Sequence, residues 1–281
     1  MKISVLTICL NSGAYLERAI NSVQNQNYAH IEHVVVDGGS GDDTLAILKK
    51  YPSLIWISEK DKGQSDAMNK AFSLATGDII VYLNADDYFE DNVFNTVIQT
   101  FNSSRAEIVI GNFFIKNDET NTLIHPSIEF KKIIFPQKYA FPYNPVSYFY
   151  KRKIQETIGK FPLQENYAMD YWFLLRALDK YQALKLDIAL GTFLLTDMSK
   201  TVLNNKNDTR RLAKEYFGKK PPITKIYFAM HNFYIDITTS IRYWTWLKLP
   251  LKYLLYVVKY KRQFRTFKEF KKMKFINLNR G

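Results

Sequence analysis

Two neighbouring carboxylates, Asp86 and Asp87, follow almost directly after an apolar run at 79–83. The run has the composition of a buried strand, so the acids are expected at its carboxyl end. In open α/β sheets, ligands bind outside the carboxyl ends of the strands, where paired carboxylates could hold a hard divalent cation beside a phosphate. The alternative is that the two acids only cap a helix beginning near Asp91, because aspartate is a favoured cap residue.

Further acids follow two earlier strand-like runs. Asp37 ends the second run, and Asp61 and Asp66 lie in the segment 59–70, which follows the third. The carboxyl ends of parallel strands open onto one edge of a sheet, so we expect these carboxylates to gather in one cleft. Like charges gathered in this way raise one another's pKa unless a cation or a ligand compensates them. Mg²⁺ or Mn²⁺ bridging a diphosphate would supply that cation.

These acids are placed by a regular alternation of strand-like and helix-like patterns in the first 110 residues. Short apolar runs predict buried strands, and apolar residues three and four apart predict amphipathic helices. The expected strands are 3–8, 33–37, 54–58 and 79–83, and the expected helices are 13–26, 43–50 and 65–75. Such alternation is typical of βαβ units, so we expect an α/β fold whose mixed, mostly parallel sheet is covered by helices on both faces.

Beyond residue 110 the pattern is less regular. An aromatic- and proline-rich stretch at 126–145 is predicted to form a lid or a binding surface. A short strand-like run at 193–195 leads to Asp197-Met198-Ser199, which we expect to line the cleft. The other expected elements are an edge hairpin at 113–121, a strand at 146–150, and helices at 167–178 and 223–241.

The positive charge of the chain lies in its last segment. Residues 241–281 hold 12 Lys and Arg against the single acid Glu269, a net of +11, which leaves about +1 of the total of +12 for residues 1–240. This distribution argues against a nucleic-acid-binding catalytic domain and favours contact between the segment and an anionic membrane surface. Its longest uncharged run, 253–258, is too short to cross a bilayer, which needs about 20 residues.

Cysteine content and the first residues bear on the compartment. A single cysteine, Cys9, excludes an intrachain disulfide and fits a reducing environment. The first residues lead directly into a strand-like run, without the apolar length of a secretory signal. We therefore expect a cytoplasmic protein that is peripheral on the inner face of the plasma membrane.

Four segments, at 4–11, 36–42, 58–70 and 83–87, carry a resemblance that no one of them would carry alone. Together and in this order they resemble family 2 glycosyltransferases of the GT-A, Rossmann-like fold, and the resemblance extends over about residues 1–200. It implies transfer of a sugar from a nucleotide diphosphate donor to an acceptor hydroxyl, with inversion at the anomeric carbon.

The resemblance also implies which residues bind the donor. Positions at the ends of the first two strands correspond to nucleoside contacts, and these are Thr7, Asn11 and Asp37, with Asp37 as the expected partner of the base. Positions after the third strand correspond to the segment that closes over ribose and diphosphate, and these are Asp61, Gly63 and Asp66.

Asn84, Ala85 and Asp86 match the Asp-x-Asp motif of the family and are also expected at the donor. Asp86 is the expected ligand of Mn²⁺ or Mg²⁺. Asn84 departs from the motif, because many members have a carboxylate there. Its amide oxygen can still accept a hydrogen bond from a ribose hydroxyl.

Segments 144–152, 159–162 and 168–176 resemble the acceptor half of the family, and Asp170 matches its catalytic carboxylate. Such a base removes the proton of the acceptor hydroxyl in a single displacement, while the metal stabilises the departing diphosphate. Met169 replaces the acid that often precedes this base. The alternative for Asp170 is an ordinary carboxylate at a helix N-terminus, where the helix dipole favours it.

We therefore expect residues 1–110 to form the nucleotide-sugar-binding half of one domain, 111–200 its acceptor-binding half, and 201–281 a helical, basic extension. The expected activity is metal-dependent, hexosyl-type transfer to a saccharide or lipid-linked saccharide acceptor, in the synthesis of cell-surface polysaccharide. Two alternatives remain. One is another nucleotide-dependent enzyme, although the chain has no Gly-x-Gly-x-x-Gly after its first strand and no phosphate loop. The other is a non-catalytic nucleotide-sugar-binding module on the same scaffold.

Overall fold

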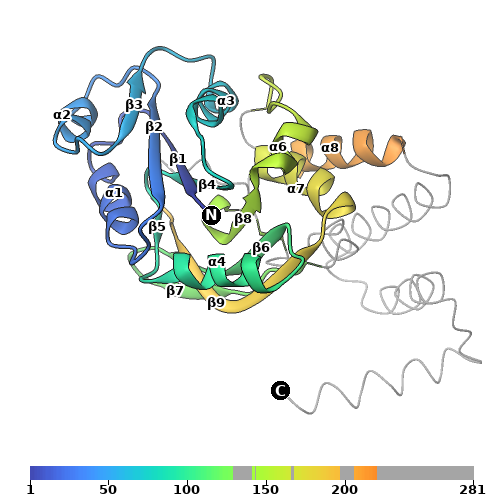
Figure 1. Ribbon diagram of the computed structural model, residues 1–281. Helices are drawn as coiled ribbons and strands as arrows, with labels where there is room; N and C mark the ends of the chain where they lie inside the picture. Colours follow the sequence, from blue (N-terminus) through green and yellow to red (C-terminus); the bar gives the residue numbers. More distant parts are fainter. Residues whose placement is uncertain (129–140, 143, 166–167, 197–205, 220–281) are drawn as a thin grey trace, which may run out of the picture. The chain divides into compact units, whose positions relative to one another are not determined.

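A mixed β-sheet forms the centre of the fold (Figure 1). The computed structural model describes residues 1–128, 141–142, 144–165, 168–196 and 206–219. The chain divides into two units, Met1–Leu212 and Ala213–Gly281, and the sheet belongs to the first. Most of the predicted lid, the residues Asp197–Ser199, the predicted helix 223–241 and the basic segment 241–281 lie outside the described residues.

The described part of the sheet has nine strands in the order β3-β2-β1-β4-β8-β6-β9-β5, with β7 paired to the side of β6. The strands are β1 Ile3–Cys9, β2 Ile31–Asp37, β3 Ile55–Ser58, β4 Ile79–Asn84, β5 Tyr88–Phe89, β6 Ile108–Lys116, β7 Asn121–Ile124, β8 Tyr148–Lys151 and β9 Ala183–Leu194. The helices are α1 Leu16–Gln24, α2 Thr44–Lys49, α3 Gln64–Leu74, α4 Val93–Ser103, α6 Arg152–Ile158, α7 Met169–Lys180 and α8 Lys206–Gly218, with a 3₁₀ turn, η1, at Pro145–Ser147.

The parallel strands end at one level, which is what places the polar residues that follow them. In the register of β1, Cys9 lies opposite Asp37 of β2 and Ile8 lies opposite Asn84 of β4. On the other side of β2, Asp37 lies opposite Ser58 of β3. The loops that leave these four strands therefore start along one edge of the sheet.

Helices cover both faces of the sheet, as predicted. On one face, Val5 of β1 and Val81 of β4 are buried in a cluster with Ala19 of α1 and Phe94 of α4. On the opposite face α3 contacts β1 and β2, and the hydroxyl of Tyr82 donates a hydrogen bond to the backbone oxygen of Met68 in α3. A mostly parallel α/β sheet with helical layers on both sides is thereby confirmed.

The strands and helices predicted for the first 110 residues all exist, with ends that differ by at most three residues. The capping alternative for Asp86 and Asp87 is wrong, because strand β5 intervenes and α4 begins only at Val93, with Asn92 before it. In the second half, the predicted strand 146–150 begins as the turn η1 and becomes β8 at Tyr148.

The part of the chain that the structure describes holds no helix with both the length and the apolar character that a bilayer crossing needs.

Candidate active site

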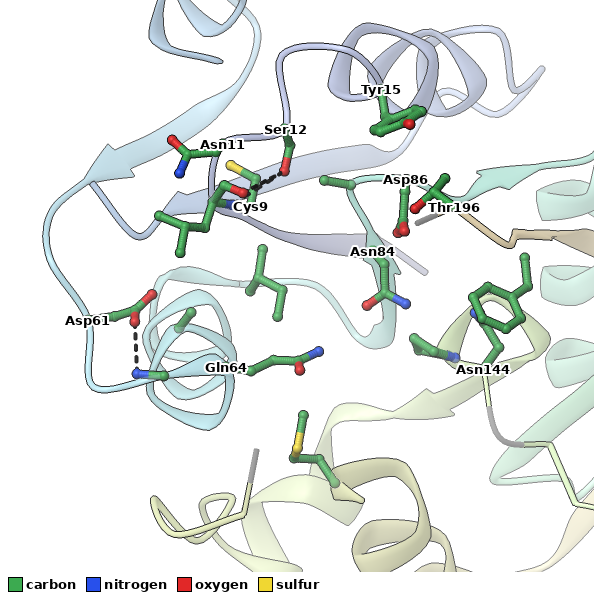
Figure 2. A pocket seen from close by; sticks show the side chains of 18 of the residues that line it. Cys9, Asn11, Ser12, Tyr15, Asp61, Gln64, Asn84, Asp86, Asn144 and Thr196 are labelled. Carbon is green, nitrogen blue, oxygen red and sulfur yellow. Dashed lines mark hydrogen bonds between the residues drawn. The ribbon is translucent and has the colours of Figure 1, made fainter. Parts of the chain in front are cut away.

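A cavity of about 360 Å³ opens at the edge where β1 and β4 end (Figure 2). Its walls come from six stretches of the chain that are far apart in sequence. The lining residues are Ile8, Cys9, Leu10, Asn11, Ser12, Tyr15, Asp61, Gly63, Gln64, Ala67, Asn84, Ala85, Asp86, Asn144, Pro145, Met169, Asp170, Phe193 and Thr196. Three carboxylates, those of Asp61, Asp86 and Asp170, thus share one cavity.

The end of β4 forms the centre of the cavity wall. Asn84, Ala85 and Asp86 all line it, as predicted from the motif. The loop is held from α1, since Nη2 of Arg18 donates a hydrogen bond to the backbone oxygen of Asp86 at 2.7 Å. The Arg18 guanidinium also lies over the ring of Tyr88, at 4.7 Å from its centroid. The Asp86 peptide is therefore fixed from outside the cavity.

Asp87 is fully buried and binds three segments of the cavity wall together. Its Oδ2 accepts hydrogen bonds from the side-chain amides of Asn84 and Asn144, both at 2.8 Å, and its Oδ1 accepts one from the backbone N–H of Leu194 at 3.0 Å. Burial, and secondly the charge of Asp86, raise the pKa of Asp87, while the two amides act in the opposite direction. Asp87 therefore supports the loop and does not line the cavity.

Besides Asn84, Ala85 and Asp86, three more of the residues predicted to bind the donor line the cavity, namely Asn11, Asp61 and Gly63. Asn11 has φ 51, in the left-handed region that asparagine tolerates, and its Oδ1 accepts a hydrogen bond from the N–H of Gly41 at 2.9 Å. Oδ1 of Asp61 accepts from the N–H of Gly63 at 2.8 Å. Gly63 precedes α3 with φ 112, which favours glycine. These contacts fix two loops against the cavity.

Close approach of these loops requires a second glycine. A Cβ atom on Gly38 would lie 2.6 Å from Oδ2 of Asp61. The Asp37-Gly38-Gly39 turn therefore packs directly against the loop that carries Asp61, and a larger residue at position 38 would displace that carboxylate.

Thr7, Asp37 and Asp66, which were also predicted to contact the donor, do not line the cavity. Thr7 is fully buried, with its Oγ1 2.9 Å from Nε2 of His33. Burial lowers the pKa of His33 to about 3, so this imidazole is neutral. In this structure the side chain of Thr7 therefore links β1 to β2 in the protein interior.

Asp37 is fully buried and organises the glycine-rich turn that follows it. Its carboxylate accepts hydrogen bonds from the hydroxyl of Ser58 at 2.6 Å, from the N–H of Ser40 at 3.0 Å, and from the hydroxyl of Ser40. Asp66 holds the loop between β3 and α3, since its Oδ2 accepts a hydrogen bond from the N–H of Lys62 at 3.0 Å. That backbone hydrogen bond is the main reason why the pKa of Asp66 is lowered.

Asp170 lies in the first turn of α7 and lines the cavity. Its Oδ1 accepts a hydrogen bond from the hydroxyl of Tyr148 in β8. Burial raises the pKa of Asp170 to about 6, against the opposite effect of the Tyr148 hydrogen bond. A carboxylate with this pKa is ionised at neutral pH and is a stronger base than an exposed aspartate.

Several lining residues were missed from the sequence. Leu10 directly follows β1 and is 52% exposed although it is apolar, an exposure that the sequence does not reveal. Gln64 could have been found because it directly follows Gly63 at the start of α3. Asn144, just before η1, and Phe193 and Thr196, at the end of β9 and just beyond it, also line the cavity. Asn144 and Phe193 lie in segments that were predicted to belong to the acceptor half, but none of the three was predicted as a site residue.

Within the described ranges, no group of three or more His, Cys, Asp or Glu side chains is arranged to hold a metal ion. A cation held by protein ligands alone therefore does not fit the described residues. One lining carboxylate, Asp86, fits a different arrangement, in which Mg²⁺ or a similar ion takes one or two carboxylates and completes its shell with substrate phosphates and water.

The fold defines a class, the GT-A-like α/β fold. Two solved structures show it. TarS of S. aureus in complex with UDP-GlcNAc matches 92% of this chain and 81% of its own, with a TM-score of 0.65 at 17% identity. The mannosyltransferase PcManGT of Pyrobaculum calidifontis in complex with GDP-Man and Mn²⁺ matches 97% of this chain and 83% of its own, with a TM-score of 0.53 at 16% identity.

The sequence profile of Glycosyl transferase family 2 matches residues 4–169, and the chain belongs to this family. An uncharacterized glycosyltransferase of Nostoc sp. (strain PCC 7120) is 33% identical over 138 residues, which cover 47% of this chain and 43% of that protein. A PGL/p-HBAD biosynthesis glycosyltransferase of Mycobacterium tuberculosis is 28% identical over 180 residues, 62% of this chain and 68% of that protein. The chain thus spans less than half the length of the first of these relatives.

Proposed function

We propose that this protein is an inverting glycosyltransferase that moves a hexosyl-type sugar from a nucleotide diphosphate donor to an acceptor hydroxyl. The observation that carries the proposal is the shared cavity of Asp86 and Asp170, which come from β4 and α7 and face one space of about 360 Å³. Membership of the family and the GT-A-like fold support the same reaction class.

In this reaction Asp170 acts as general base. Its carboxylate takes the proton of the acceptor hydroxyl while the acceptor oxygen bonds to the anomeric carbon. The bond from that carbon to the donor diphosphate breaks, and the electron pair leaves with the diphosphate. One displacement inverts the configuration, and the single lining carboxylate on α7 suits a mechanism with one base.

Asp86 is the proposed protein ligand of Mn²⁺ or Mg²⁺, which would neutralise the diphosphate as it departs. Asn11, Asp61, Gly63, Asn84 and Ala85 are the other proposed donor contacts, because all of them line the same cavity. We assign Thr7, Asp37 and Asp66 the role of holding these contacts in place, because their side chains bond to the strands and loops behind the cavity.

This assignment gives the domain two halves. Residues 1–110 supply the donor side, through β1, the loop before α3, and β4, and residues 111–200 supply the acceptor side, through η1, α7 and β9. Residues 201–281 are the proposed extension.

A screen of nucleoside diphosphates by thermal shift tests the donor half of the proposal. We expect one nucleotide to raise Tm by about 5 °C or more at 100 times its Kd, because a ligand at that excess stabilises the native state by about 2.7 kcal/mol. Mn²⁺ should increase the shift, and EDTA should reverse that increase. If every nucleotide left Tm unchanged with and without Mn²⁺, the donor assignment would be refuted.

For the acceptor we propose a saccharide or lipid-linked saccharide in cell-surface polysaccharide synthesis, reached by an enzyme that is peripheral on the inner face of the membrane. The net charge of +11 in residues 241–281 supports this location. Each Lys or Arg near an anionic leaflet contributes about 1 kcal/mol, so several together could hold the protein there reversibly.

Vesicle sedimentation of the full chain tests this location. We expect binding to vesicles that contain anionic lipid, and release by salt. Replacing Lys268, Lys271, Lys272 and Lys274 by glutamine should weaken it on the order of 100-fold or more, at about 1 kcal/mol for each charge. Equal binding to neutral vesicles, or no effect of the four substitutions, would contradict the proposal.

A further inference from the structure

Tyr148 is the residue of the strand layer that contacts Asp170 directly. It is the first residue of β8, its side chain is 1% exposed, and its hydroxyl donates a hydrogen bond to Oδ1 of Asp170. Tyr148 and the backbone N–H of Asp170 itself are the donors to this carboxylate among the described residues.

The ring of Tyr148 is held by two neighbouring aromatic rings, which fix the direction of its hydroxyl toward Asp170. It stacks on the ring of Tyr150 with 6.2 Å between centroids and on that of Phe173 with 6.5 Å, at interplanar angles of 24° and 22°. Phe173 lies three residues after Asp170 on α7, and residues three apart lie on the same face of a helix. One face of α7 therefore packs on the Tyr148 ring and presents the carboxylate to its hydroxyl.

From this contact we propose that Tyr148 is a positioning residue for the catalytic base: it fixes the Asp170 carboxylate toward the cavity and keeps it ionised at neutral pH. The inference rests on the proposed role of Asp170 as general base.

The hydrogen bond from Tyr148 is the main effect that opposes the rise in the pKa of Asp170 on burial. Burial raises the pKa of Asp170 to about 6, and the Tyr148 hydrogen bond acts against that rise. Burial also raises the pKa of the Tyr148 phenol well above its usual value, so the hydroxyl stays protonated and remains a donor.

Other titratable or charged groups near Asp170 have different partners or lie farther off. The hydroxyl of Tyr150 donates to Oε1 of Gln155, and the hydroxyl of Tyr82 donates to the backbone oxygen of Met68. On α7 itself, Arg176 lies over the Trp172 ring, 4.3 Å from its centroid. The carboxylates of Asp61, in the loop before α3, and Asp86, just after β4, line the same cavity.

These contacts determine whether loss of the Tyr148 hydroxyl raises or lowers the pKa of Asp170. A hydrogen bond from a neutral donor stabilises the ionised carboxylate, so its removal must raise the pKa of Asp170 further. Hydrogen bonds to charged groups are strong enough to shift a pKa by about one unit or more. Tyr148→Phe should therefore move the acid limb of kcat/KM from about pH 6 in the wild type to higher pH by about one unit.

The loss of rate should then depend on pH. With a shift of about one unit, the ionised fraction of the base falls about five-fold at pH 6 and about two-fold at pH 7, and hardly changes above pH 8.5. A merely structural defect would lower the rate by the same factor at every pH. A pH-independent loss, or an unmoved acid limb, would overturn the proposal.

Tyr150→Phe is the matched control. Tyr150 is fully buried on the same strand, its ring also packs against that of Phe173 with 4.6 Å between centroids, and its hydroxyl donates to Gln155 instead of Asp170. The Tyr150→Phe variant loses the same hydroxyl oxygen from the same aromatic layer, so the acid limb of its kcat/KM profile should stay where it is in the wild type. An equal shift in both variants would show that general loosening of the tyrosine layer, and not the Tyr148 hydroxyl, moves the pKa.

A carboxyl NMR titration of ¹³C-aspartate-labelled protein makes the test independent of turnover. The Asp170 signal is assigned by its absence in Asp170→Asn, and its midpoint should rise in Tyr148→Phe but not in Tyr150→Phe. If no transfer were found, the titration would still decide the role of Tyr148, so failure of the reaction assignment and failure of this inference are distinguishable.

Incorporation of 3-fluorotyrosine at position 148 covers the case in which Tyr148→Phe does not fold. Fluorine makes the phenol a stronger hydrogen-bond donor and leaves the ring in place. The Asp170 midpoint should then move to lower pH, and a midpoint that stays fixed or rises would contradict the inference.

Discussion

Asp170→Asn is expected to lower kcat by about 10²- to 10⁴-fold, which is the usual contribution of a positioned general base. Asparagine keeps the shape of the side chain and can still accept the hydrogen bond from Tyr148 through its oxygen. It cannot take a proton from the acceptor hydroxyl. Steady-state kinetics with donor and acceptor would measure the loss, and calorimetry should find the Kd for the nucleotide unchanged, because Asp170 is not a proposed donor contact.

Asp179→Asn is the control for this substitution. Asp179 lies near the end of the same helix and is exposed, so the same change there should leave kcat within about two-fold, in keeping with the small effects of surface substitutions. An Asp170→Asn enzyme with the wild-type kcat would refute the assignment of the base. A wild-type protein that binds the nucleotide sugar and transfers nothing to any acceptor would instead favour the non-catalytic binding module.

The first half of the fold could be predicted because its signals are local. Each of the first four strands is a short apolar run, and the polar residue at its end marks the edge of the sheet. Since β1 pairs in parallel with β2 and β4, the placement of Asp37 and Asn84 beside Cys9 and Ile8 follows from topology alone. That is why the sequence alone predicts that the motif around Asp86 lies at a cleft.

Membership of the cavity wall was harder to predict, because it depends on which way each side chain points. Successive residues of a strand face opposite sides of the sheet. Thr7 lies only three residues before Leu10, yet it is fully buried against His33, while Leu10 is 52% exposed at the cavity. The carboxylate of Asp37 likewise does not line the cavity and accepts a hydrogen bond from the backbone N–H of Ser40 in the following glycine-rich turn. A resemblance places such residues near a ligand, and the packed structure shows which of them line the cavity and which lie behind it.

The acceptor side could be predicted least. Asn144 and Leu194 are 50 residues apart, and Asp87 gathers both by hydrogen bonds, so no local pattern could reveal that they belong to one wall. The Asp170 position was found through the resemblance. Its buried partner Tyr148 was not, because a tyrosine in a strand ordinarily indicates packing.

Asp86→Asn is expected to weaken Mn²⁺-dependent nucleotide binding on the order of 100-fold or more. A unit charge pair at close range in a partly buried site is worth about 4 kcal/mol, of which desolvation offsets a part. Calorimetric titration of the nucleotide identified in the screen, with Mn²⁺ and with EDTA, measures the effect. The variant should bind in Mn²⁺ about as weakly as the wild type binds in EDTA.

Asp91→Asn serves as the control, since Asp91 is an exposed acid five residues along the chain and lies outside the cavity wall. Persistence of full Mn²⁺ dependence in Asp86→Asn would remove Asp86 from the metal site. Asp87 would not be its replacement, because Oδ2 of Asp87 already accepts from two amides and Oδ1 from the backbone N–H of Leu194. A cation at Asp87 would have to displace donors that hold three segments of the wall together. Of the two acids that follow β4, Asp86 is therefore the one that lines the cavity, and Asp87 is the one that holds its wall together.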